Sequence, residues 1–338
     1  MKLMKVQEAI GQMLCHDITQ IIPGVKKGPV FRKGHIIQEE DIPILLNVGK
    51  EHVYIWEVNE NMLHENDAAM ILYDLCASEN ITHGEIKEGK IEAKAKIDGL
   101  LKIDRERLLT VNSQGEMMIA SRHGDFPVKA GDPVAGMRVI PLIIEKAKME
   151  KVKHDARGSP IFKILPFVIK KVGIVTTGSE VYHHRIEDKF TPVVRAKVEE
   201  YGGEVIGHKI CDDNTEMQIS FINELLGMGA EMVLCTGGMS VDPDDRTPYA
   251  IRQASDIVIT YGSPVLPGAM FMLAYKANVP VVGLSGCVMH AKRTVFDLIL
   301  PRLMAKDSVT LEEINRLGEG GLCLNCKLCT FPNCGFGK

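Results

Sequence analysis

Four cysteines close together near the end of the sequence are the first side chains able to do chemistry. Cys323, Cys326, Cys329 and Cys334 follow the pattern C-x₂-C-x₂-C-x₄-C within residues 318–338. Thiols at this density predict a metal site rather than four unrelated free thiols. Three closely spaced thiolates can hold one corner of an iron–sulfur cluster while the fourth closes it, whereas zinc usually takes two separated C-x₂-C pairs. We therefore expect an iron–sulfur cluster, with Zn²⁺ as the alternative.

Glycine and hydroxyl residues recur after short apolar runs in the second half of the chain. The groups are Thr177-Gly178-Ser179-Glu180, Thr236-Gly237-Gly238-Met239-Ser240 and Ser285-Gly286, with Pro267 and Gly268 before the last. Hydroxyls and closely approachable backbone N–H groups suit a phosphate or a carboxylate. These groups do not match the G-x₄-G-K-[ST] or G-x-G-x₂-G nucleotide patterns. A single such turn is usually structural, but three at corresponding strand ends predict a site for an anionic small molecule.

Two acidic groups accompany these loops. They are Asp212 with Asp213, and Asp242, Asp244 and Asp245. Carboxylates repel a phosphate unless a cation lies between them, so Mg²⁺ is an expected companion of the ligand. The structural alternative is that Asp213 or the residue after it caps a helix and that Asp244 and Asp245 form a polar turn.

The elements that would position these loops alternate between buried strands and helices. Continuous apolar runs at residues 172–175, 232–235 and 281–284 are typical of strands buried on both faces, and another strand begins at Val205. Strand, loop and helix in this order indicate an α/β fold with a doubly wound, mostly parallel sheet. Right-handed crossovers place the strand-to-helix loops at one edge, where such sheets bind ligands. We expect this domain to span residues 171–305.

Helix starts within this domain are marked by capping residues. The expected starts are Thr191 with Pro192, Thr215 with Gln218 in capping-box spacing, and Thr247 with Pro248. A last helix is expected from about His290 to Met304.

The remaining segments differ in character. Residues 1–150 alternate short apolar runs with turn signals, which predicts a smaller β-rich α+β accessory region. Strands are expected at residues 53–56, 109–111, 117–120 and 134–140, and a helix at residues 66–77. Residues 151–170 are expected to be a connector. Residues 318–338 form the cysteine-rich tail, whose glycines would leave it mobile without metal.

Composition limits the function classes. The chain has 338 residues, of which 45% are hydrophobic and 25% charged, as in soluble proteins with proper cores. A net charge of −4 gives no overall attraction to nucleic acid or an anionic membrane. The sequence has no run of about eighteen apolar residues that could form a transmembrane helix, and no signal peptide is evident. We therefore expect a cytoplasmic protein, in which the nine cysteines would not form disulfides. We also expect a homo-oligomer.

The loop sequences, taken as a set, resemble the molybdopterin-binding domain of molybdenum-cofactor biosynthesis proteins. The segments that carry the resemblance are TTGSE, CDDN, TGGMSVDPDDRTP, VLPGAM and GLSGC, in this order. This domain occurs in molybdopterin adenylyltransferases, in molybdopterin molybdotransferases and in competence-damage-inducible proteins. More faintly, KAGDPVAGMRVIPL, CHDIT and FRKGHII resemble parts of the β-rich accessory domains of the molybdotransferases.

The resemblance implies a pterin dithiolene phosphate bound across the loops. The family's acidic functional positions fall on Asp212 and Asp245. Its first ligand loop falls on Thr177, Gly178 and Glu180, and its second on Gly237, Gly238 and Ser240.

Two loops depart from the molybdotransferase pattern. Residues 266–270 stand where those enzymes have Lys-Pro-Gly-Lys-Pro, so both basic positions are lost. Residues 285–288 replace a Pro-Gly-Asn-Pro loop and keep only its glycine. Without the two cations, molybdate or a pyrophosphate should bind less well.

Three hypotheses follow. The chain is an enzyme of cofactor maturation, a molybdopterin-handling transferase without the usual basic residues. Alternatively, it is a non-catalytic carrier or sensor that binds the pterin and contacts a molybdoenzyme or another cofactor-biosynthesis protein. A third hypothesis is a Mg²⁺-dependent nucleotide pyrophosphatase of the competence-damage-inducible type.

Overall fold

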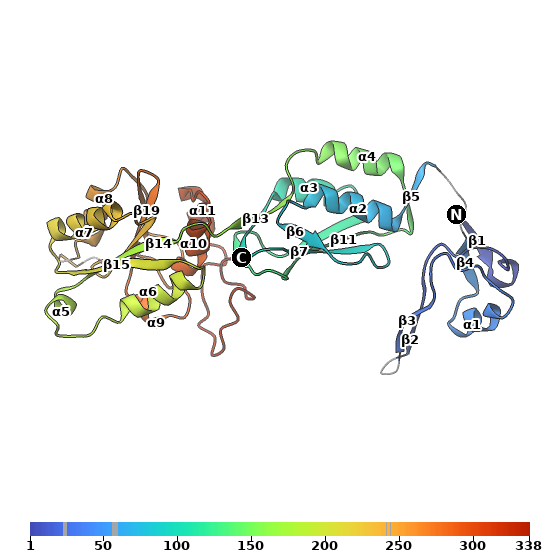
Figure 1. The fold of residues 1–338 in the computed structure, drawn as a ribbon, viewed down its shortest axis with the longest axis horizontal. Helices are drawn as coiled ribbons and strands as arrows, with labels where there is room; N and C mark the ends of the chain where they lie inside the picture. The colour runs from blue at the N-terminus through green and yellow to red at the C-terminus, as the bar shows by residue number, and fades with distance from the viewer. Residues whose placement is uncertain (23–25, 56–59, 241, 244) are drawn as a thin grey trace. The chain divides into compact units, whose positions relative to one another are not determined.

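A computed structural model describes residues 1–22, 26–55, 60–240, 242–243 and 245–338 (Figure 1). The chain folds into two compact units. Unit 1 comprises residues 1–94, 104–122 and 133–162, and unit 2 comprises residues 95–103, 123–132 and 163–338. Within the described ranges, no helix combines the length and apolar character needed to cross a membrane.

The first part of unit 1 has two small sheets around its own core. β1 (Lys2–Lys5) pairs antiparallel with β4 (His52–Ile55), and β2 (Ile18–Ile22) forms a hairpin with β3 (Lys26–Phe31). The 3-10 helix η1 (Val6–Glu8) and the helix α1 (Asp41–Asn47) complete it. The buried core includes Val6, Leu14, Ile37, Leu45 and Val53.

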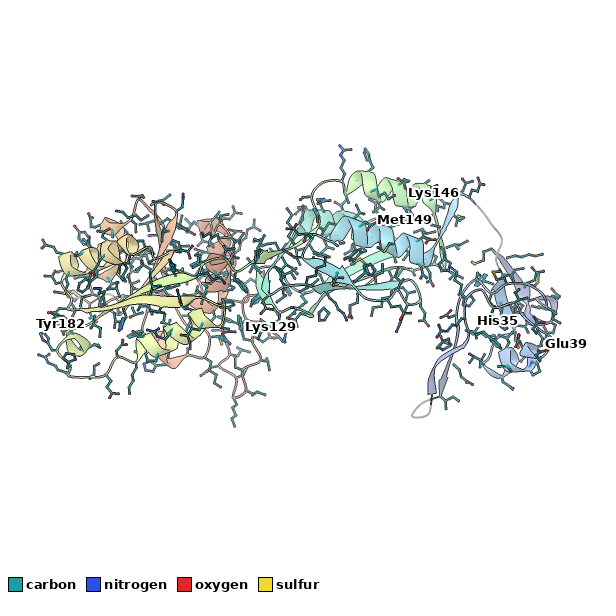
Figure 2. The ribbon with its side chains drawn as sticks, in the orientation of Figure 1. His35, Glu39, Lys129, Lys146, Met149 and Tyr182 are labelled. Carbon is teal, nitrogen blue, oxygen red and sulfur yellow. The ribbon has the colours of Figure 1, made fainter. Side chains whose placement is uncertain are left out.

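The rest of unit 1 packs helices on an antiparallel sheet. Its strands are β6 (Ile81–His83), β7 (Lys90–Ala95), β11 (Pro133–Val139) and β9 (Met117–Ser121), in that order, with the separate pair β5 (Met62–His64) and β12 (Ile143–Glu145). The helices are α2 (Glu65–Cys76), α3 (Arg105–Asn112) and α4 (Lys146–Asp155). Met149 of α4, labelled in Figure 2, is fully buried.

Sequence patterns in unit 1 are borne out for most elements. The helix expected at residues 66–77 is α2, and the strands expected at 53–56, 117–120 and 134–140 are β4, β9 and β11. The strand expected at residues 109–111 is wrong, because these residues form the end of α3. The Asp104 side chain accepts a hydrogen bond from Arg107 N and caps that helix, and only Val111 is buried on it.

Unit 2 is built on a six-stranded sheet with strand order β15-β14-β16-β19-β18-β17. The strands are β14 (Lys171–Thr177), β15 (Glu204–Cys211), β16 (Met232–Thr236), β17 (Ile257–Tyr261), β18 (Met272–Lys276) and β19 (Val279–Leu284). The first four in spatial order are parallel, and the last two pair antiparallel. The mostly parallel sheet predicted from the apolar runs is confirmed.

Helices cover both faces of this sheet, as Figure 1 shows. One face carries α7 (Thr215–Gly227) and α8 (Thr247–Ala254), whose Ile222, Leu225 and Ile251 enter one core. The other carries α6 (Phe190–Glu199) and α10 (Val295–Met304), whose Val194 and Phe296 enter a second core. The short helices are α5 (Ser179–Tyr182), α9 (Cys287–His290) and α11 (Leu311–Arg316).

Two helix starts differ from the expected caps. α6 begins at Phe190, because Asp188 Oδ1 accepts hydrogen bonds from the backbone N–H groups of Phe190 and Thr191. α7 is capped by Asn214, whose side chain accepts from Met217 N, so the Thr215 capping box is not formed. α8 begins at Thr247 with proline in its first turn, as expected, but its N-cap position is Arg246 and no side chain caps it, so Thr247 is not the cap.

Segments from earlier in the sequence join unit 2. β8 (Gly99–Ile103) lies between β10 (Phe126–Val128) and β13 (Phe162–Pro166) in a three-stranded sheet. The residues expected as a connector, 151–170, therefore contain the end of α4 and β13.

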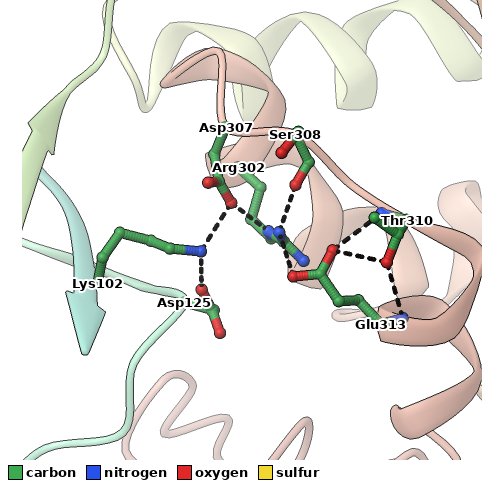
Figure 3. Close-up of polar contacts among 7 residues, drawn as sticks. All are labelled: Lys102, Asp125, Arg302, Asp307, Ser308, Thr310 and Glu313. Carbon is green, nitrogen blue, oxygen red and sulfur yellow. Dashed lines mark hydrogen bonds and ion pairs between the residues drawn. The ribbon is translucent and has the colours of Figure 1, made fainter. Parts of the chain in front are cut away.

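A charged network ties β8 to the end of α10 (Figure 3). Lys102 Nζ lies 2.5 Å from Asp125 Oδ1 and 2.9 Å from Asp307 Oδ2. The guanidinium of Arg302 donates to Asp307 Oδ2 at 2.6 Å, to the Ser308 carbonyl at 2.6 Å and to Glu313 Oε1 at 3.0 Å. Burial opposes the charge on Arg302, but Asp307 and Glu313 together hold its pKa above the ordinary value.

Candidate functional site

The polar loops of unit 2 lie at the carboxyl edge of the sheet. β14 ends at Thr177, which pairs with Cys211 at the end of β15, while Thr176 pairs with Thr236 at the end of β16. Thr236 in turn pairs with Leu284, the last residue of β19. The loops that follow these four strands are therefore neighbours, as the parallel order predicts.

A fifth loop reaches the same edge from the antiparallel strands. Tyr261, at the end of β17, pairs with Met272, and Met272 pairs with Gly283 near the end of β19. The β17–β18 connection, residues 262–271, must then leave the sheet where the other loops do. It contains Pro267 and Gly268, so the structure brings this segment to the edge that carries the other predicted ligand loops.

The first and second loops are joined through Thr177. Its hydroxyl donates to the Thr236 carbonyl at 3.2 Å and lies 3.1 Å from Thr247 Oγ1 at the start of α8. Thr177, Thr236 and Thr247 are all buried. These buried hydroxyls connect the two loops within the protein interior. Direct contact of Thr177 or Thr236 with a ligand stays a prediction.

Gly237 and Gly238 let the second loop pass directly over Thr177. Both have positive φ, +83° and +57°. A Cβ on Gly237 would lie 2.2 Å from the Thr177 carbonyl oxygen, and one on Gly238 would lie 2.7 Å from Thr247 Oγ1. Only glycine fits such a close backbone crossing. The loop then continues to the exposed Ser240.

The first loop is fixed by the acidic loop after β15. Gly178 N donates to the Cys211 carbonyl at 3.2 Å, and Ser179 N donates to Asp213 Oδ2 at 3.1 Å. The Ser179 N–H, expected to face a ligand, is therefore used within the protein. Glu180 is exposed in α5, close to Tyr182, which is labelled in Figure 2.

Carboxylates from three loops act electrostatically on Asp213. Burial raises the pKa of Asp213, and the nearby charges of Asp212, Glu180 and Asp245 raise it further, against the hydrogen bond from Ser179. Asp212 Oδ2 also lies 3.8 Å from His183 Nε2. Within the described ranges, however, no three acidic, histidine or cysteine side chains are gathered closely enough to hold a metal ion, so Mg²⁺ binding by Asp212 and Asp245 stays a prediction.

Tyr261, at the end of β17, connects to the second loop. Burial raises the pKa of Tyr261, and the charge of Asp245 raises it further. The Tyr261 hydroxyl donates to the Met239 carbonyl at 3.1 Å. The second loop is therefore joined to the start of the fifth loop through Tyr261. Asp244, also expected to contact the ligand, lies outside the described residues.

The remaining predicted loop residues are also at this edge. Ser285 Oγ lies 3.1 Å from Cys287 Sγ, and Gly286 is exposed. Gly268 has φ +118°, and a Cβ there would lie 2.8 Å from Val295 Cγ1. The Pro267 carbonyl accepts from Val295 N at 3.2 Å, so the fifth loop rests on the start of α10.

A polar network behind the first loop was missed by sequence reasoning. His208 Nε2, in β15, lies 3.0 Å from Thr176 Oγ1, 2.9 Å from Thr191 Oγ1 and 3.3 Å from Asp188 Oδ2. Thr236 Oγ1 donates to Thr176 Oγ1 at 3.2 Å and connects the network to the second loop. A single histidine within a strand has no periodic signal, so only the fold reveals its partners.

Gln218 is a second residue whose setting the sequence did not indicate. Expected as part of a capping box, it lies in the first turns of α7 and is 1% exposed. Its side-chain amide has no hydrogen-bond partner among the described residues.

The network around His208 predicts a pH dependence of stability. Burial lowers the pKa of His208 below its ordinary value of 6.5, against the charge of Asp188. Below that value the unfolded chain binds the proton more readily than the folded chain. The free energy of unfolding should therefore fall as pH falls from about 7.5 to about 5.5. It should fall less steeply in His208→Gln, as urea unfolding at several pH values would measure.

A matched control is the exposed His52→Gln, which should keep the wild-type slope. Some slope should remain in His208→Gln, because burial also lowers the pKa of His16 and His64. Identical slopes for His208→Gln and wild type would contradict the prediction.

The cysteine tail is packed on unit 2 rather than free. Gly320, Gly321 and Gly337 sit at close contacts, with a Cβ on Gly320 falling 2.2 Å from the Lys338 carbonyl oxygen. These three glycines therefore lie at packed positions, and Phe336 is buried in the core shared with α10. Mobility of the tail without metal stays a prediction.

The predicted metal ligands Cys323, Cys326, Cys329 and Cys334 all line one cavity. In the described part of the chain, however, no three Cys, His, Asp or Glu side chains are gathered closely enough to hold a metal ion. The preformed cluster site expected from the spacing is absent there, and iron–sulfur or zinc binding stays a prediction.

Comparison with known proteins confirms the resemblance of the loops. Residues 173–305 match the family described as a probable molybdopterin binding domain, and residues 3–57 match a domain family of unknown function. The chain is 23% identical over 301 residues to a molybdopterin molybdenumtransferase of Staphylococcus epidermidis. That alignment covers 83% of this chain, and the chain spans 65% of the relative's length.

Other similarities cover less of the sequence. A CinA-like protein of Mycobacterium tuberculosis is 32% identical over 89 residues, which is 25% of this chain and 20% of that protein. Among solved structures, MoaB of Thermus thermophilus is 19% identical with a TM-score of 0.37, covering 42% of this chain and 99% of that chain. CinA of Thermoplasma acidophilum is 14% identical with a TM-score of 0.35, covering 40% of this chain and 98% of that chain.

Proposed function

We propose that this chain binds molybdopterin or a related pterin phosphate, because residues 173–305 match the family described as a probable molybdopterin binding domain. It would act in molybdenum-cofactor biosynthesis or delivery. The observation that carries the proposal is the meeting of five loops at one sheet edge, with Asp212 and Asp245 both within electrostatic range of Asp213.

The loops at the carboxyl edge of the sheet would contribute to ligand binding in different ways. Gly178, Gly237 and Gly238 let the backbone approach the ligand, as a phosphate site requires. Asp212 and Asp245 would hold Mg²⁺ against the phosphate, with Ser240, Ser285 and Gly286 as further contacts; these roles are our assignment. The buried threonines and His208 would keep the loops in register.

The charge of the fifth loop favours binding or delivery over molybdate insertion. Residues 266–270 hold no lysine or arginine, so the site would have few protein cations to neutralise a second anion beside the pterin phosphate. The carboxylates suit a Mg²⁺-assisted reaction on a phosphate, so a transferase role is tested alongside binding.

A nucleotide pyrophosphatase is the second candidate. It is favoured by the segment TGGMSVDPDDRTP and by the 89-residue similarity to the CinA-like protein. Hydrolysis needs the acidic loops and Mg²⁺ but not the lost lysines.

The test starts with the full chain purified without oxygen and titrated with molybdopterin in the presence and absence of Mg²⁺. Asp245→Asn should weaken Mg²⁺-dependent binding roughly 10–100-fold, the range typical for altered metal-site carboxylates. Asp74→Asn, at an exposed position of α2, should bind as the wild type does.

Assays with ATP, with molybdate and with dinucleotides then separate the alternatives. Binding without turnover supports a carrier, adenylation or molybdate insertion supports a transferase, and pyrophosphate-bond cleavage supports the hydrolase. A chain that does not bind the pterin, with or without Mg²⁺, would overturn the proposal.

A further inference from the structure

The four tail cysteines share one cavity, although they come from different parts of the tail. The cavity has a volume of about 270 Å³ and is lined by Cys323, Cys326, Cys329 and Cys334. Its walls also include apolar side chains, among them Phe331. Four thiols that line one mostly apolar pocket are the ligand type of a metal–thiolate site, although they must still approach one another to hold a metal.

One end of the tail is fixed to the fifth loop. Leu266 N donates to the Gly321 carbonyl and Cys323 N donates to the Leu266 carbonyl, each at 2.8 Å. This pairing sets Cys323 beside the segment that continues into Pro267 and Gly268.

The other end is fixed by aromatic packing. Cys334 and Phe331 pack against the core that contains the buried Phe336. Phe331 lies near Phe126 and Phe336, with ring centroids 5.9 Å and 6.2 Å apart. Two of the four cysteines are thus held in place by the fold.

The middle of the tail carries the other two cysteines on irregular backbone. Cys326 and Cys329 are exposed, and residues 324–330 contain no helix or strand. Leu324 and Leu328 are each 79% exposed, an unfavourable position for leucine. Movement of this short segment toward the cavity would bring its two thiols to the fixed pair.

Two cations from the connection between α9 and α10 border the cavity. Lys292 Nζ donates to the carbonyls of Cys326 at 3.1 Å and Lys327 at 2.6 Å. Arg293 stacks over Phe331, 4.8 Å from the ring centroid. Arg293 also forms ion pairs with Asp297 at 2.9 Å and with Glu200 at 3.7 Å, which hold its side chain in this position. Positive charge here suits an anionic cluster with thiolate ligands.

We propose that Cys323, Cys326, Cys329 and Cys334 bind a [4Fe–4S] cluster in this cavity, with residues 324–330 closing over it. The four-thiolate set and its short spacing fit the corners of a cubane, and Lys292 and Arg293 compensate its negative charge. The site goes beyond the proposed function, because it uses none of the residues assigned to the pterin. It lies next to the pterin loops through Leu266 and through the α9–α10 connection.

The experiment measures metal in the full chain purified without oxygen and reconstituted with sulfide and equal amounts of ferrous and ferric iron, which together supply the mixed valence of a [4Fe–4S]²⁺ cluster. We expect about four iron and four acid-labile sulfide per chain, with the broad visible absorption of a thiolate-bound cluster. Cys326→Ser and Cys329→Ser should each lose most of the iron and sulfide. Cys287→Ser, a half-buried cysteine outside the tail, should retain them.

Folding and pterin binding are followed separately. Because Cys326 and Cys329 are exposed, their serine variants should keep the wild-type circular dichroism spectrum and thermal midpoint of the metal-free chain. Loss of iron with these unchanged supports the cluster. Failure of pterin binding in a chain that holds iron and sulfide would overturn the proposed function and leave the cluster intact.

Three results would overturn the cluster. They are stoichiometric zinc with no acid-labile sulfide, iron retained in the Cys326→Ser/Cys329→Ser double variant, and no iron bound after reconstitution of a correctly folded chain.

Discussion

Replacing Gly237 by alanine is expected to lower the free energy of unfolding by about 3 kcal/mol, the sum of left-handed backbone strain and overpacking. The new Cβ would lie 2.2 Å from the Thr177 carbonyl oxygen, which is backbone and cannot rotate away. Relief requires the first and second loops to separate, so pterin binding should be lost as well. Urea unfolding and ligand titration measure the two effects.

The matched control is Gly227→Ala at the end of α7. A Cβ on Gly227 meets nothing within 4 Å, and its backbone does not need glycine. This variant should be as stable as the wild type or slightly more so, and should bind the ligand normally. If Gly237→Ala unfolded at the same urea concentration as Gly227→Ala, the loop crossing described for Thr177 would be wrong.

Replacing Arg302 by methionine is expected to cost about 3–5 kcal/mol, the range for breaking a buried ion pair from one side. The Arg302 side chain is 7% exposed, and its loss would leave Asp307 without one of two cations and Glu313 without the cation that faces it. Methionine fills similar volume, so the loss would come from the unpaired carboxylates rather than from a cavity. Chemical unfolding of the full chain measures it.

Arg316→Met makes the same change at an exposed ion pair. Arg316 and Glu312 are each 73% exposed, and such pairs contribute at most about 1 kcal/mol. The difference between the two variants should persist at high salt, because only exposed pairs are screened. Equal destabilisation by both variants would show that the Arg302 network adds nothing beyond a surface pair.

The ligand edge could be predicted from the sequence because its signals are local. Three of the four parallel strands, β14, β16 and β19, contain a continuous apolar run that leads into glycine and hydroxyl residues. The right-handed crossovers of such a sheet place these strand ends at one edge. The same reasoning did not find β17 and β18, whose antiparallel pairing brings residues 262–271 to that edge. Strand direction depends on long-range pairing, which the apolar pattern does not encode.

The errors have similar causes. Residues 109–111 have a strand-like composition, but the Asp104 cap places them in a helix. Thr191 was expected to cap α6, yet Asp188 does so and leaves the Thr191 hydroxyl to bond His208. The packing of the tail was also not indicated by its sequence, because a Cβ on Gly318 or Gly337 would meet Pro264 or Leu298, which lie in other segments of the chain. In each case a distant or competing partner outweighs the local pattern.

The division of the chain into two interleaved units has a practical consequence for dissecting it. The backbone passes between the units at 94/95, 103/104, 122/123, 132/133 and 162/163. A fragment beginning at residue 163 would lack β8 and β10, and with them Lys102 and Phe126, the partners of Asp307 and Phe331. A single protease cut should therefore not release an independently folded half, and gene truncation at the family boundary should yield a chain with an exposed α10 face.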